Sequence, residues 1–307
     1  MKIKRPNFWH KRNIYSYFFF PFTIITFIIN FLKSFLIKNK LSIKTICVGN
    51  IFIGGTGKTS LVIEINKILN KKSKTVFIKK KYKNQKDEIQ LLQKNGNLVV
   101  HKNRIKAIKI AEDKGFKIAL LDDGLQQKNI NYDLKIVCFN SYEGFGNGYL
   151  LPAGPLRENI NEIKKYDIAV INGEKKNKKL YLKIKSINEN IKIFKGKYVP
   201  KNLSKLDRKK KYFMFCGIGN PKEFENTLKK YKFKIKNKKI FPDHFQISSA
   251  EIEKLKKFAL KKNLDLITTE KDYLRIKKND RSDIKYLKID LKINDIEKFK
   301  NILSLNL

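Results

Sequence analysis

The sequence has few cysteines, few arginines and few acidic residues, and each shortage excludes something. Its three cysteines, Cys47, Cys138 and Cys216, are odd in number and far apart, which excludes a disulfide framework and a cysteine-rich metal site. We therefore expect the bulk of the chain in a reducing compartment. Seven of its 69 basic residues are Arg, and Lys is the poorer residue for bidentate recognition of phosphates and bases.

The shortage of acids leaves a formal charge of +41 on 307 residues, of which 42% are hydrophobic. A chain with this apolar content can bury a core, so we predict a folded protein of one large or two ordinary domains, and not a disordered polycation. Two interpretations of the charge stay open. It reflects either a compositional bias towards Lys with a solvated surface, or a surface that binds an anionic partner.

A run of twenty uncharged residues, Asn13–Leu32, follows a short basic start. About 20 apolar residues cross a hydrocarbon core of ~30 Å, and Trp9 and Tyr15 lie where an aromatic belt would form. We predict a membrane anchor over residues 1–37, spanning or re-entrant. A helix buried in the protein is the alternative, which Pro21 and the lack of a polar face weaken. Cationic residues flank both ends, so charge leaves the orientation open.

Beyond this segment, short apolar runs alternate with helical periodicity, the pattern of a parallel sheet covered by helices. We predict a P-loop NTPase-like α/β domain over residues 38–205, a smaller α/β domain over 206–307, and an extended linker or ribbon over 195–206. Ser248 and Glu251 form a capping-box pattern that predicts a helix start. The predicted strands are 43–48, 75–78, 118–121, 134–139 and 168–171, followed by 212–216, 236–240 and 264–268.

The sharpest local motif is VGNIFIGGTGKTS, Val48–Ser60, between the first predicted strand and an amphipathic helix. Its glycines allow the backbone to wrap around phosphate oxygens at a helix N-terminus. Lys58 would meet the β and γ phosphates and the Thr59 hydroxyl would serve Mg²⁺. The strict phosphate-loop pattern requires Gly where this chain has Phe52, so the match is partial. The residues predicted to bind ATP are Gly54, Gly55, Thr56, Gly57, Lys58, Thr59 and Ser60.

A second element of a nucleotide site is an acid at the end of a neighbouring strand. Residues 118–121 run directly into Asp122, Asp123 and Gly124, which fits a carboxylate that holds the metal or its water shell. Adjacent side chains on a strand point opposite ways, so both acids can act only if the chain is already turning at Gly124. The alternative is a pair of acids that merely begins a turn.

These residues and several downstream resemble the tetraacyldisaccharide 4′-kinases, membrane-bound enzymes that phosphorylate the lipid A precursor of Gram-negative bacteria. The similarity extends over nearly the whole chain, and the family's own phosphate loop also lacks the first Gly of the strict pattern. It rests, besides the loop, on KDEIQLL at 86–92, DDGLQQ at 122–127, LLPAGPLRE at 150–158, FCGIGNP at 215–221, FPDHF at 241–245 and TTEKDYLR at 268–275.

The resemblance implies transfer of the γ-phosphoryl group of ATP to the 4′-hydroxyl of a tetraacyldisaccharide 1-phosphate. Asp87 in KDE resembles the acid that acts with a His, here His244 of FPDHF, to activate the sugar hydroxyl. Asp122 and Asp123 resemble the metal-associated acids, with Asp123 also expected to be catalytic beside Lys58. Glu158, next to Arg157, resembles a further acid, which we predict to serve Mg²⁺ with Thr59 and Asp122.

The residues alone leave some roles open. His10 and His101 have poor contexts, so His244 is the best candidate general base by elimination, although a His beside an Asp is more often a loop residue. Asp87 could instead be a helix N-cap. The chain also departs from the family at three places: Lys79, Lys80 and Lys81 stand where SRG is common, Gln127 replaces a His, and the loop from the phosphate site to Asp87 is short. These departures concern the substrate side and leave the ATP machinery intact.

The sequence therefore predicts an ATP- and Mg²⁺-dependent lipid kinase at the bacterial inner membrane, with its catalytic domains on the cytoplasmic side and no nucleic-acid partner. The anchor would keep the site at the membrane surface, where an acylated substrate is embedded. The main alternative is a membrane-tethered P-loop ATPase that acts as a conformational switch or assembly factor. A nucleic-acid-binding protein is the second alternative, although no reader motif is visible.

Overall fold

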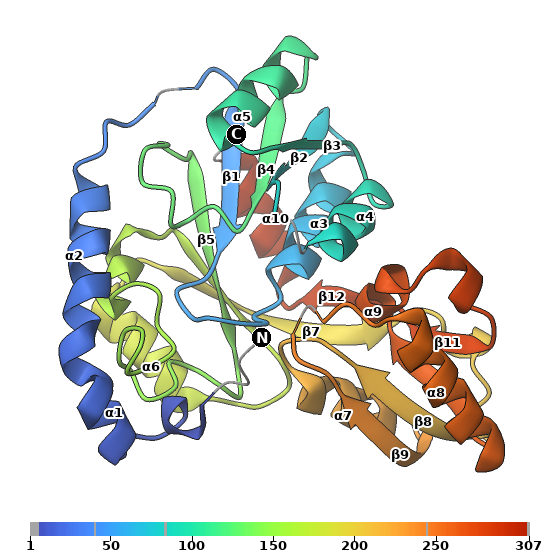
Figure 1. Cartoon of the computed structure of the whole chain (residues 1–307). Helices are drawn as coiled ribbons and strands as arrows, with labels where there is room; N and C mark the ends of the chain where they lie inside the picture. Colours follow the sequence, from blue (N-terminus) through green and yellow to red (C-terminus); the bar gives the residue numbers. More distant parts are fainter. Residues whose placement is uncertain (1–5, 40, 83–84, 244, 306–307) are drawn as a thin grey trace. The chain divides into compact units, whose positions relative to one another are not determined.

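The structure is a computed structural model that describes residues 6–39, 41–82, 85–243 and 245–305 (Figure 1). The chain forms two compact units. The larger unit comprises Arg5–Lys81, Asn95–Lys197 and Leu291–Leu307, and the smaller comprises Tyr82–Lys94 and Tyr198–Asp290.

An eight-stranded sheet with the order β12-β7-β6-β5-β1-β4-β2-β3 forms the centre of the larger unit. The central strands pair in parallel and are almost wholly buried, which explains why they read in the sequence as continuous apolar runs. Since β1 lies between β4 and β5, the loop that follows β1 opens where the strand order reverses, the usual place for a ligand. The strands are β1 (Lys44–Gly49), β2 (Thr75–Lys80), β3 (Leu98–His101), β4 (Ile118–Asp122), β5 (Leu134–Asn140), β6 (Ile168–Asn172), β7 (Lys192–Pro200) and β12 (Ile289–Ile293).

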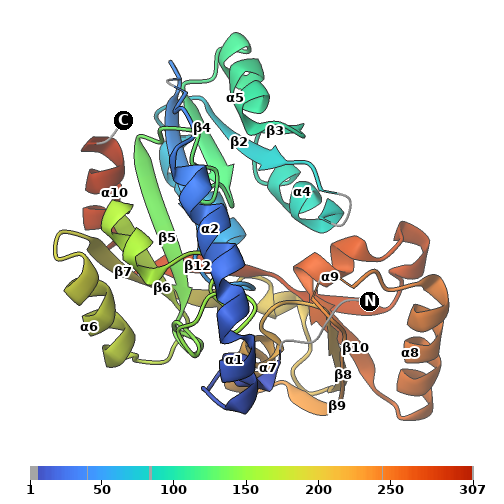
Figure 2. The same cartoon turned by 60° about the vertical axis from the view of Figure 1, so that its left-hand side comes forward.

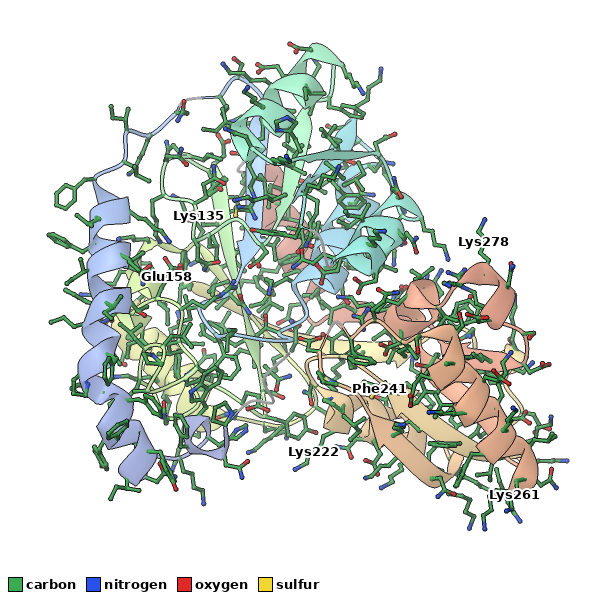
Figure 3. The ribbon with its side chains drawn as sticks, viewed as in Figure 1. Lys135, Glu158, Lys222, Phe241, Lys261 and Lys278 are labelled. Atoms are coloured by element: carbon green, nitrogen blue, oxygen red, sulfur yellow. The ribbon has the colours of Figure 1, made fainter. Side chains whose placement is uncertain are left out.

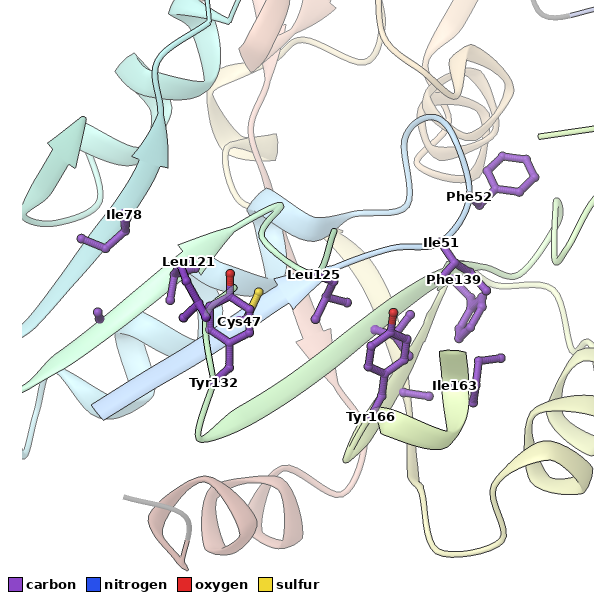
Figure 4. Close-up of a cluster of buried hydrophobic side chains, with 14 of the residues drawn as sticks. Cys47, Ile51, Phe52, Ile78, Leu121, Leu125, Tyr132, Phe139, Ile163 and Tyr166 are labelled. Atoms are coloured by element: carbon purple, nitrogen blue, oxygen red, sulfur yellow. The ribbon is translucent and has the colours of Figure 1, made fainter. Parts of the chain in front are cut away.

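Helix α3 packs against β1, β2 and β4, and its buried face is the predicted apolar one. A cluster of buried side chains from the strands and the adjoining loops forms the core of this unit, with Cys47 and Tyr132 behind the acidic turn and Phe52 inserted from the phosphate loop (Figure 4). The helices of this unit after the N-terminal segment are α3 (Lys58–Leu69), α5 (Arg104–Asp113), α6 (Lys178–Ile187) and α10 (Ile296–Leu305), with the 3₁₀ helix η3 (Ile160–Lys165).

The apolar N-terminal segment is helical and lies along the larger unit (Figures 1 and 2). Asn13 and Ser16 form a reciprocal capping box that starts its first helix, and Pro21 lies in a short 3₁₀ turn that joins the two α-helices. The stretch Ile14–Ser34 is long and apolar enough to cross a membrane by length and composition, and 6% of that window is buried. Its elements are η1 (Asn7–Trp9), α1 (Ile14–Phe19), η2 (Phe20–Phe22) and α2 (Thr23–Ser34).

The smaller unit contains a four-stranded sheet with the order β11-β10-β8-β9, in which each neighbouring pair is parallel. Ser248 caps α8 by accepting a hydrogen bond from the Glu251 amide, as predicted. The elements are α4 (Lys86–Gln93), η4 (Leu203–Lys205), β8 (Lys211–Cys216), α7 (Pro221–Lys230), β9 (Lys234–Ile240), α8 (Ser249–Lys261), β10 (Asp265–Thr269), α9 (Glu270–Arg275), η5 (Lys278–Asp280) and β11 (Ile284–Leu287).

The compact units differ from the predicted domains, 38–205 and 206–307, at three places. Residues 82–94 belong to the smaller unit because α4 packs on α9. Residues 291–307 belong to the larger unit because β12 joins its sheet and Phe299 packs edge-on to Phe194 of β7 at 5.0 Å. Residues 198–205 belong to the smaller unit, and the predicted linker over 195–206 is extended as far as Pro200, where strand β7 ends.

Lysines make up part of the exposed surface of the smaller unit. In the smaller unit Lys222, Lys261 and Lys278 are exposed and extend outward (Figure 3). All three cysteines are buried and free, and burial raises the pKa of each thiol to about 12. None of the three is paired in a disulfide in the structure.

Candidate active site

The loop between β1 and α3 has the conformation that its glycines predict. Gly54 and Gly57 have φ values of 123° and 85°, a region that side chains other than Gly rarely adopt. Gly57 is the N-cap of α3, so the helix begins at Lys58 and its second residue is Thr59. The predicted ATP-binding residues 54–60 thus form one continuous turn into a helix N-terminus, an arrangement suited to phosphate.

Asn50 holds this loop together from the inside. Its buried side-chain amide nitrogen lies 2.6 Å from the carbonyl oxygen of Phe52, 3.2 Å from that of Gly54 and 2.9 Å from the Thr56 hydroxyl. At the far end of the loop, Asn172 of β6 donates a 2.6 Å hydrogen bond to the Thr56 carbonyl. The loop is therefore shaped before any ligand binds, which lowers the entropy cost of binding.

The departure at Phe52 has a packing explanation. Its side chain is 3% exposed and part of the core. Its backbone makes an antiparallel bridge to Leu156, and the flanking Ile53 amide donates to the Pro155 carbonyl at 2.8 Å. Residues 51–53 are thereby joined to the segment that carries Arg157 and Glu158, and a Gly at position 52 would remove the buried ring from this junction.

Asp122 and Asp123 both face the phosphate loop because the chain turns between them. Strand β4 ends at Asp122, and Asp123 has a φ of 63°, one residue earlier than the turn predicted at Gly124. Left-handed φ is tolerated by Asp better than by most residues. Gly124 must still be Gly, since a Cβ there would lie 2.7 Å from the Cys47 sulfur.

The acids are surrounded by cations and by Thr59. Thr59 Oγ1 lies 3.3 Å from Asp122 Oδ2. Asp123 Oδ1 lies 3.7 Å from Lys58 Nζ and 2.9 Å from Arg157 Nη2. Burial acts to raise the pKa of Asp123, but the charges of Lys58 and Arg157 outweigh it and hold that pKa well below its usual range. Lys58 and Asp123 are therefore in contact, as the prediction of a shared catalytic role requires.

The residues present fit a hydrated Mg²⁺ ion. Within the described part of the chain, Asp122 is fully buried and its Oδ1 atom has no hydrogen-bond partner, and the Thr59 hydroxyl is on the other oxygen. Such an ion usually takes one or two protein ligands and completes its shell with water and phosphate. This agrees with the finding that no group of three or more His, Cys, Asp or Glu among the described residues could hold a metal.

Glu158, predicted to serve the metal and labelled in Figure 3, is part of an ion-pair network with Lys128. Lys128 Nζ is 2.5 Å from Glu158 Oε1, and Gln126 Nε2 donates to Glu158 Oε2 at 2.7 Å. Gln126 also donates to the Asn50 carbonyl at 2.8 Å. The structure thus connects Glu158 to the phosphate loop through Gln126, and its predicted contact with Mg²⁺ stays a prediction.

In the smaller unit, Asp87 lies in the first turn of α4 and is 2% exposed. The N-cap of α4 is Gln85, so the N-cap alternative for Asp87 is wrong. Asp87 Oδ2 accepts a 2.7 Å hydrogen bond from Arg275, whose other terminal nitrogen pairs with Asp272 at 2.7 Å. His244 lies outside the described residues, so its predicted pairing with Asp87 stays a prediction.

Sequence reasoning did not identify several residues of the site. Asn50 occupies an ordinary loop position, and Arg275 ends the TTEKDYLR motif without an obvious role. Arg104 donates hydrogen bonds to the Asp123 carbonyl and, at 3.1 Å, to Gln127 Oε1. Gln127, where the family commonly has His, therefore braces the acidic turn through Arg104. Lys79 is buried beside Asp122, which its place in a run of three lysines did not reveal.

The parallel sheet, the glycine loop leading into Lys58 and Thr59, and the acid beside Thr59 define a P-loop α/β protein. Its family is narrower than that class. Residues 17–307 match the model of the family described as tetraacyldisaccharide-1-P 4'-kinase, and the chain belongs to this family. The family predicted from the sequence is thereby confirmed.

Similar proteins cover almost the whole chain. A tetraacyldisaccharide 4'-kinase of Pelagibacter ubique (strain HTCC1062) is 47% identical over 308 residues, which cover 98% of this chain and 97% of that protein. One of Rickettsia felis (strain ATCC VR-1525 / URRWXCal2) is 36% identical and covers 96% and 95%. A crystal structure of "apo" form LpxK from Aquifex aeolicus in complex with ATP has a TM-score of 0.71 at 24% identity and covers 95% and 99%, which supports the fold.

Proposed function

We propose that this chain transfers the γ-phosphoryl group of ATP to the 4′-hydroxyl of a tetraacyldisaccharide 1-phosphate, a step of lipid A biosynthesis. The observation that carries the proposal is the family match over residues 17–307 together with the contacts among Lys58, Thr59 and the acidic pair in the larger unit. The reaction needs positioning and charge neutralisation, which a preformed loop with paired cations supplies.

Each predicted residue has a role in this reaction. Residues 54–60 would bind the ATP phosphates, with Lys58 neutralising charge that develops on the transferred group. Thr59 and Asp122 would hold Mg²⁺, and Glu158 would join them once Lys128 is released. When bound, the ion supplies charge neutralisation at the phosphates. Asp87 and His244 would act on the acceptor side, where the acid orients the imidazole that takes the hydroxyl proton.

An assay with ATP labelled with ³²P at the γ position tests the function directly. Label should appear in a lipid extract only when the disaccharide 1-phosphate is supplied. Release of labelled phosphate without labelled lipid would contradict the kinase proposal and favour the membrane-tethered ATPase switch. A nucleic-acid role would instead appear as DNA or RNA binding that falls steeply with salt.

We further propose that Ile14–Ser34 attaches the protein to the inner membrane, with the catalytic units on the cytoplasmic side. Two polar side chains on one face of α2 are used within the larger unit. Thr26 Oγ1 donates to the Leu151 carbonyl at 2.7 Å, and Asn30 Nδ2 donates to the Arg157 carbonyl at 2.8 Å. The exposed apolar side chains elsewhere on the segment range from 46% exposed at Ile29 to 77% exposed at Ile14. Together they form a large apolar patch, which favours contact with a lipid surface.

Charges on the exposed face should therefore release the protein from membranes. The double variant Ile25→Asp and Leu32→Asp replaces side chains that are 56% and 61% exposed. We expect the fraction that floats with anionic phospholipid vesicles to fall by about tenfold or more, since each charge opposes burial in lipid. Leu260→Asp, at an 83% exposed position of α8, is the matched control and should leave flotation unchanged. Equal flotation of the double variant and the wild type would refute the attachment.

A further inference from the structure

Lys79 is a buried cation on the acid of the proposed metal site. Strands β2 and β4 pair so that Ile78 lies beside Leu121, and the next residues, Lys79 and Asp122, are at the same edge of the sheet. Lys79 Nζ lies 2.6 Å from Asp122 Oδ2, and the two side chains are 3% and 0% exposed. The pair is therefore shielded from water. Removing either charge would leave the other one buried and uncompensated by its partner.

The ammonium and Thr59 share one carboxylate oxygen. Asp122 Oδ2 accepts from Lys79 Nζ at 2.6 Å and from Thr59 Oγ1 at 3.3 Å, while Oδ1 has no partner among the described residues. A divalent ion bound to Asp122 and Thr59 would thus find the charge of the acid already balanced. A positive charge a few ångströms away also repels a divalent ion directly.

Lys81, two residues further on, lies in different surroundings. It is exposed, and its backbone amide donates to the His101 carbonyl at 3.1 Å. The burial of Lys79 is therefore a property of that position and not of the Lys-rich composition. A lysine placed for solubility would extend into water, because burying an ammonium is unfavourable unless a partner compensates it.

We propose that Lys79 is a built-in counter-ion of Asp122, a positioning residue that takes the electrostatic place of the metal when no metal is bound. This inference deepens the proposed function and rests on it for the identity of the nucleotide. It follows that the nucleotide site keeps its structure without Mg²⁺ and that Lys79 weakens the binding of Mg²⁺ to Asp122 and Thr59. Nucleotide binding should also depend less on Mg²⁺ than it would in a chain without the Lys79 charge.

Binding of a metal alone tests the counter-ion role without any nucleotide. We expect Lys79→Met to lower the dissociation constant for Mn²⁺, used as a paramagnetic probe for Mg²⁺, by about tenfold or more, because the acid loses its competing cation. Lys79→Gln, which removes the charge and retains a hydrogen-bond donor, should act in the same direction. Lys79→Arg keeps the charge and should bind Mn²⁺ as the wild type does. Lys81→Met is the matched control for loss of one lysine.

A second readout is the ratio of the dissociation constants of a non-hydrolysable ATP analogue in EDTA and in excess Mg²⁺. It should rise by about tenfold or more in Lys79→Met and Lys79→Gln and stay constant in Lys79→Arg and Lys81→Met. Added Mg²⁺ should also raise the melting temperature of Lys79→Met more than that of the wild type, since the metal replaces the lost partner. This measurement covers the case in which the variant folds poorly without metal.

Unchanged Mn²⁺ affinity in both neutral variants, or an equal change in Lys81→Met, would overturn the proposal. The result is distinguishable from failure of the proposed function. If the wild type labels no lipid but Lys79→Met binds Mn²⁺ more tightly, the kinase proposal fails and the counter-ion proposal stands. If the wild type labels lipid but neither neutral variant changes Mn²⁺ binding, the counter-ion proposal fails and the kinase proposal stands.

Discussion

Lys58→Ala should lower the turnover of phosphoryl transfer by about two to three orders of magnitude, the usual cost of removing one charged donor from a preorganised site. Lys58 is the first residue of α3, and its ammonium already lies at the loop, 3.7 Å from Asp123 Oδ1. Ala favours helices as much as Lys does, so the backbone of the loop should keep its conformation. The measurement is kcat for lipid labelling at saturating ATP and disaccharide.

A lysine at the other end of the same helix provides the control. Lys67, in the last turn of α3, pairs with Glu64 at 3.3 Å, and a partly exposed pair of this kind contributes little to stability. Lys67→Ala should therefore keep both turnover and melting temperature close to those of the wild type. Near-normal turnover in Lys58→Ala would refute the phosphate-loop assignment, whatever the control shows.

The central strands could be predicted because burial on both faces leaves a local pattern. All eight predicted strands are present, and β1, predicted over 43–48, runs over Lys44–Gly49. Strands β3, β11 and β12 escaped prediction, and β7 was predicted only as part of an extended linker or ribbon over 195–206. In β7 and β12, exposed lysines alternate with buried residues, so a chain with Lys and Ile in every segment gives these strands too little contrast.

The site could be predicted as far as its motifs were continuous in the sequence. The phosphate loop and the acidic turn each lie in one short segment, and local geometry brings their residues together. The partners of these residues are distant, since Lys79 and Asp122 are 43 positions apart and Asp87 and Arg275 are 188 apart. Such pairs depend on strand order and helix packing, which a single sequence does not fix.

The assignment of α4 to the smaller unit illustrates the same limit. Its residues, 86–93, lie between two strands of the larger sheet, so continuity along the chain favoured the first domain. Packing on α9 and the ion pair of Lys271 with Glu88 at 3.0 Å place it with the other unit. A predicted catalytic acid, Asp87, changes units with it, and the charge that holds this acid comes from the last residue of α9.

Arg275 carries that charge and lies in a buried triad with two acids. Removing Arg275 should therefore lower stability much more than removing one of the acids. Arg275 pairs with both Asp87 and Asp272 and donates to the Gly217 carbonyl at 2.6 Å. Burial acts to lower the pKa of Arg275, but the two acids outweigh it and raise that pKa. Burial raises the pKa of Asp272. The one guanidinium thus pairs with two buried carboxylates.

Arg275→Met should therefore lower the free energy of unfolding of the smaller unit by about 3–5 kcal/mol, because it removes the guanidinium that pairs with two buried acids. Asp87→Asn should cost only about 1–2 kcal/mol, since Arg275 keeps Asp272 and Gly217, yet it should abolish most lipid labelling if Asp87 acts on the acceptor. Hydrogen exchange at the Gly217 amide, which donates to Asp272 at 3.0 Å, reports the local loss even if the units unfold separately.

Arg208→Met, at an exposed position of the same unit, is the control and should change the free energy of unfolding by less than about 0.5 kcal/mol. If Arg275 and Asp87 formed an ordinary one-to-one pair, removing either partner would cost about the same. Equal losses would thus contradict the triad. A larger loss in Asp87→Asn would mean that this acid is held for stability, and the case for its catalytic role would then rest on His244 alone.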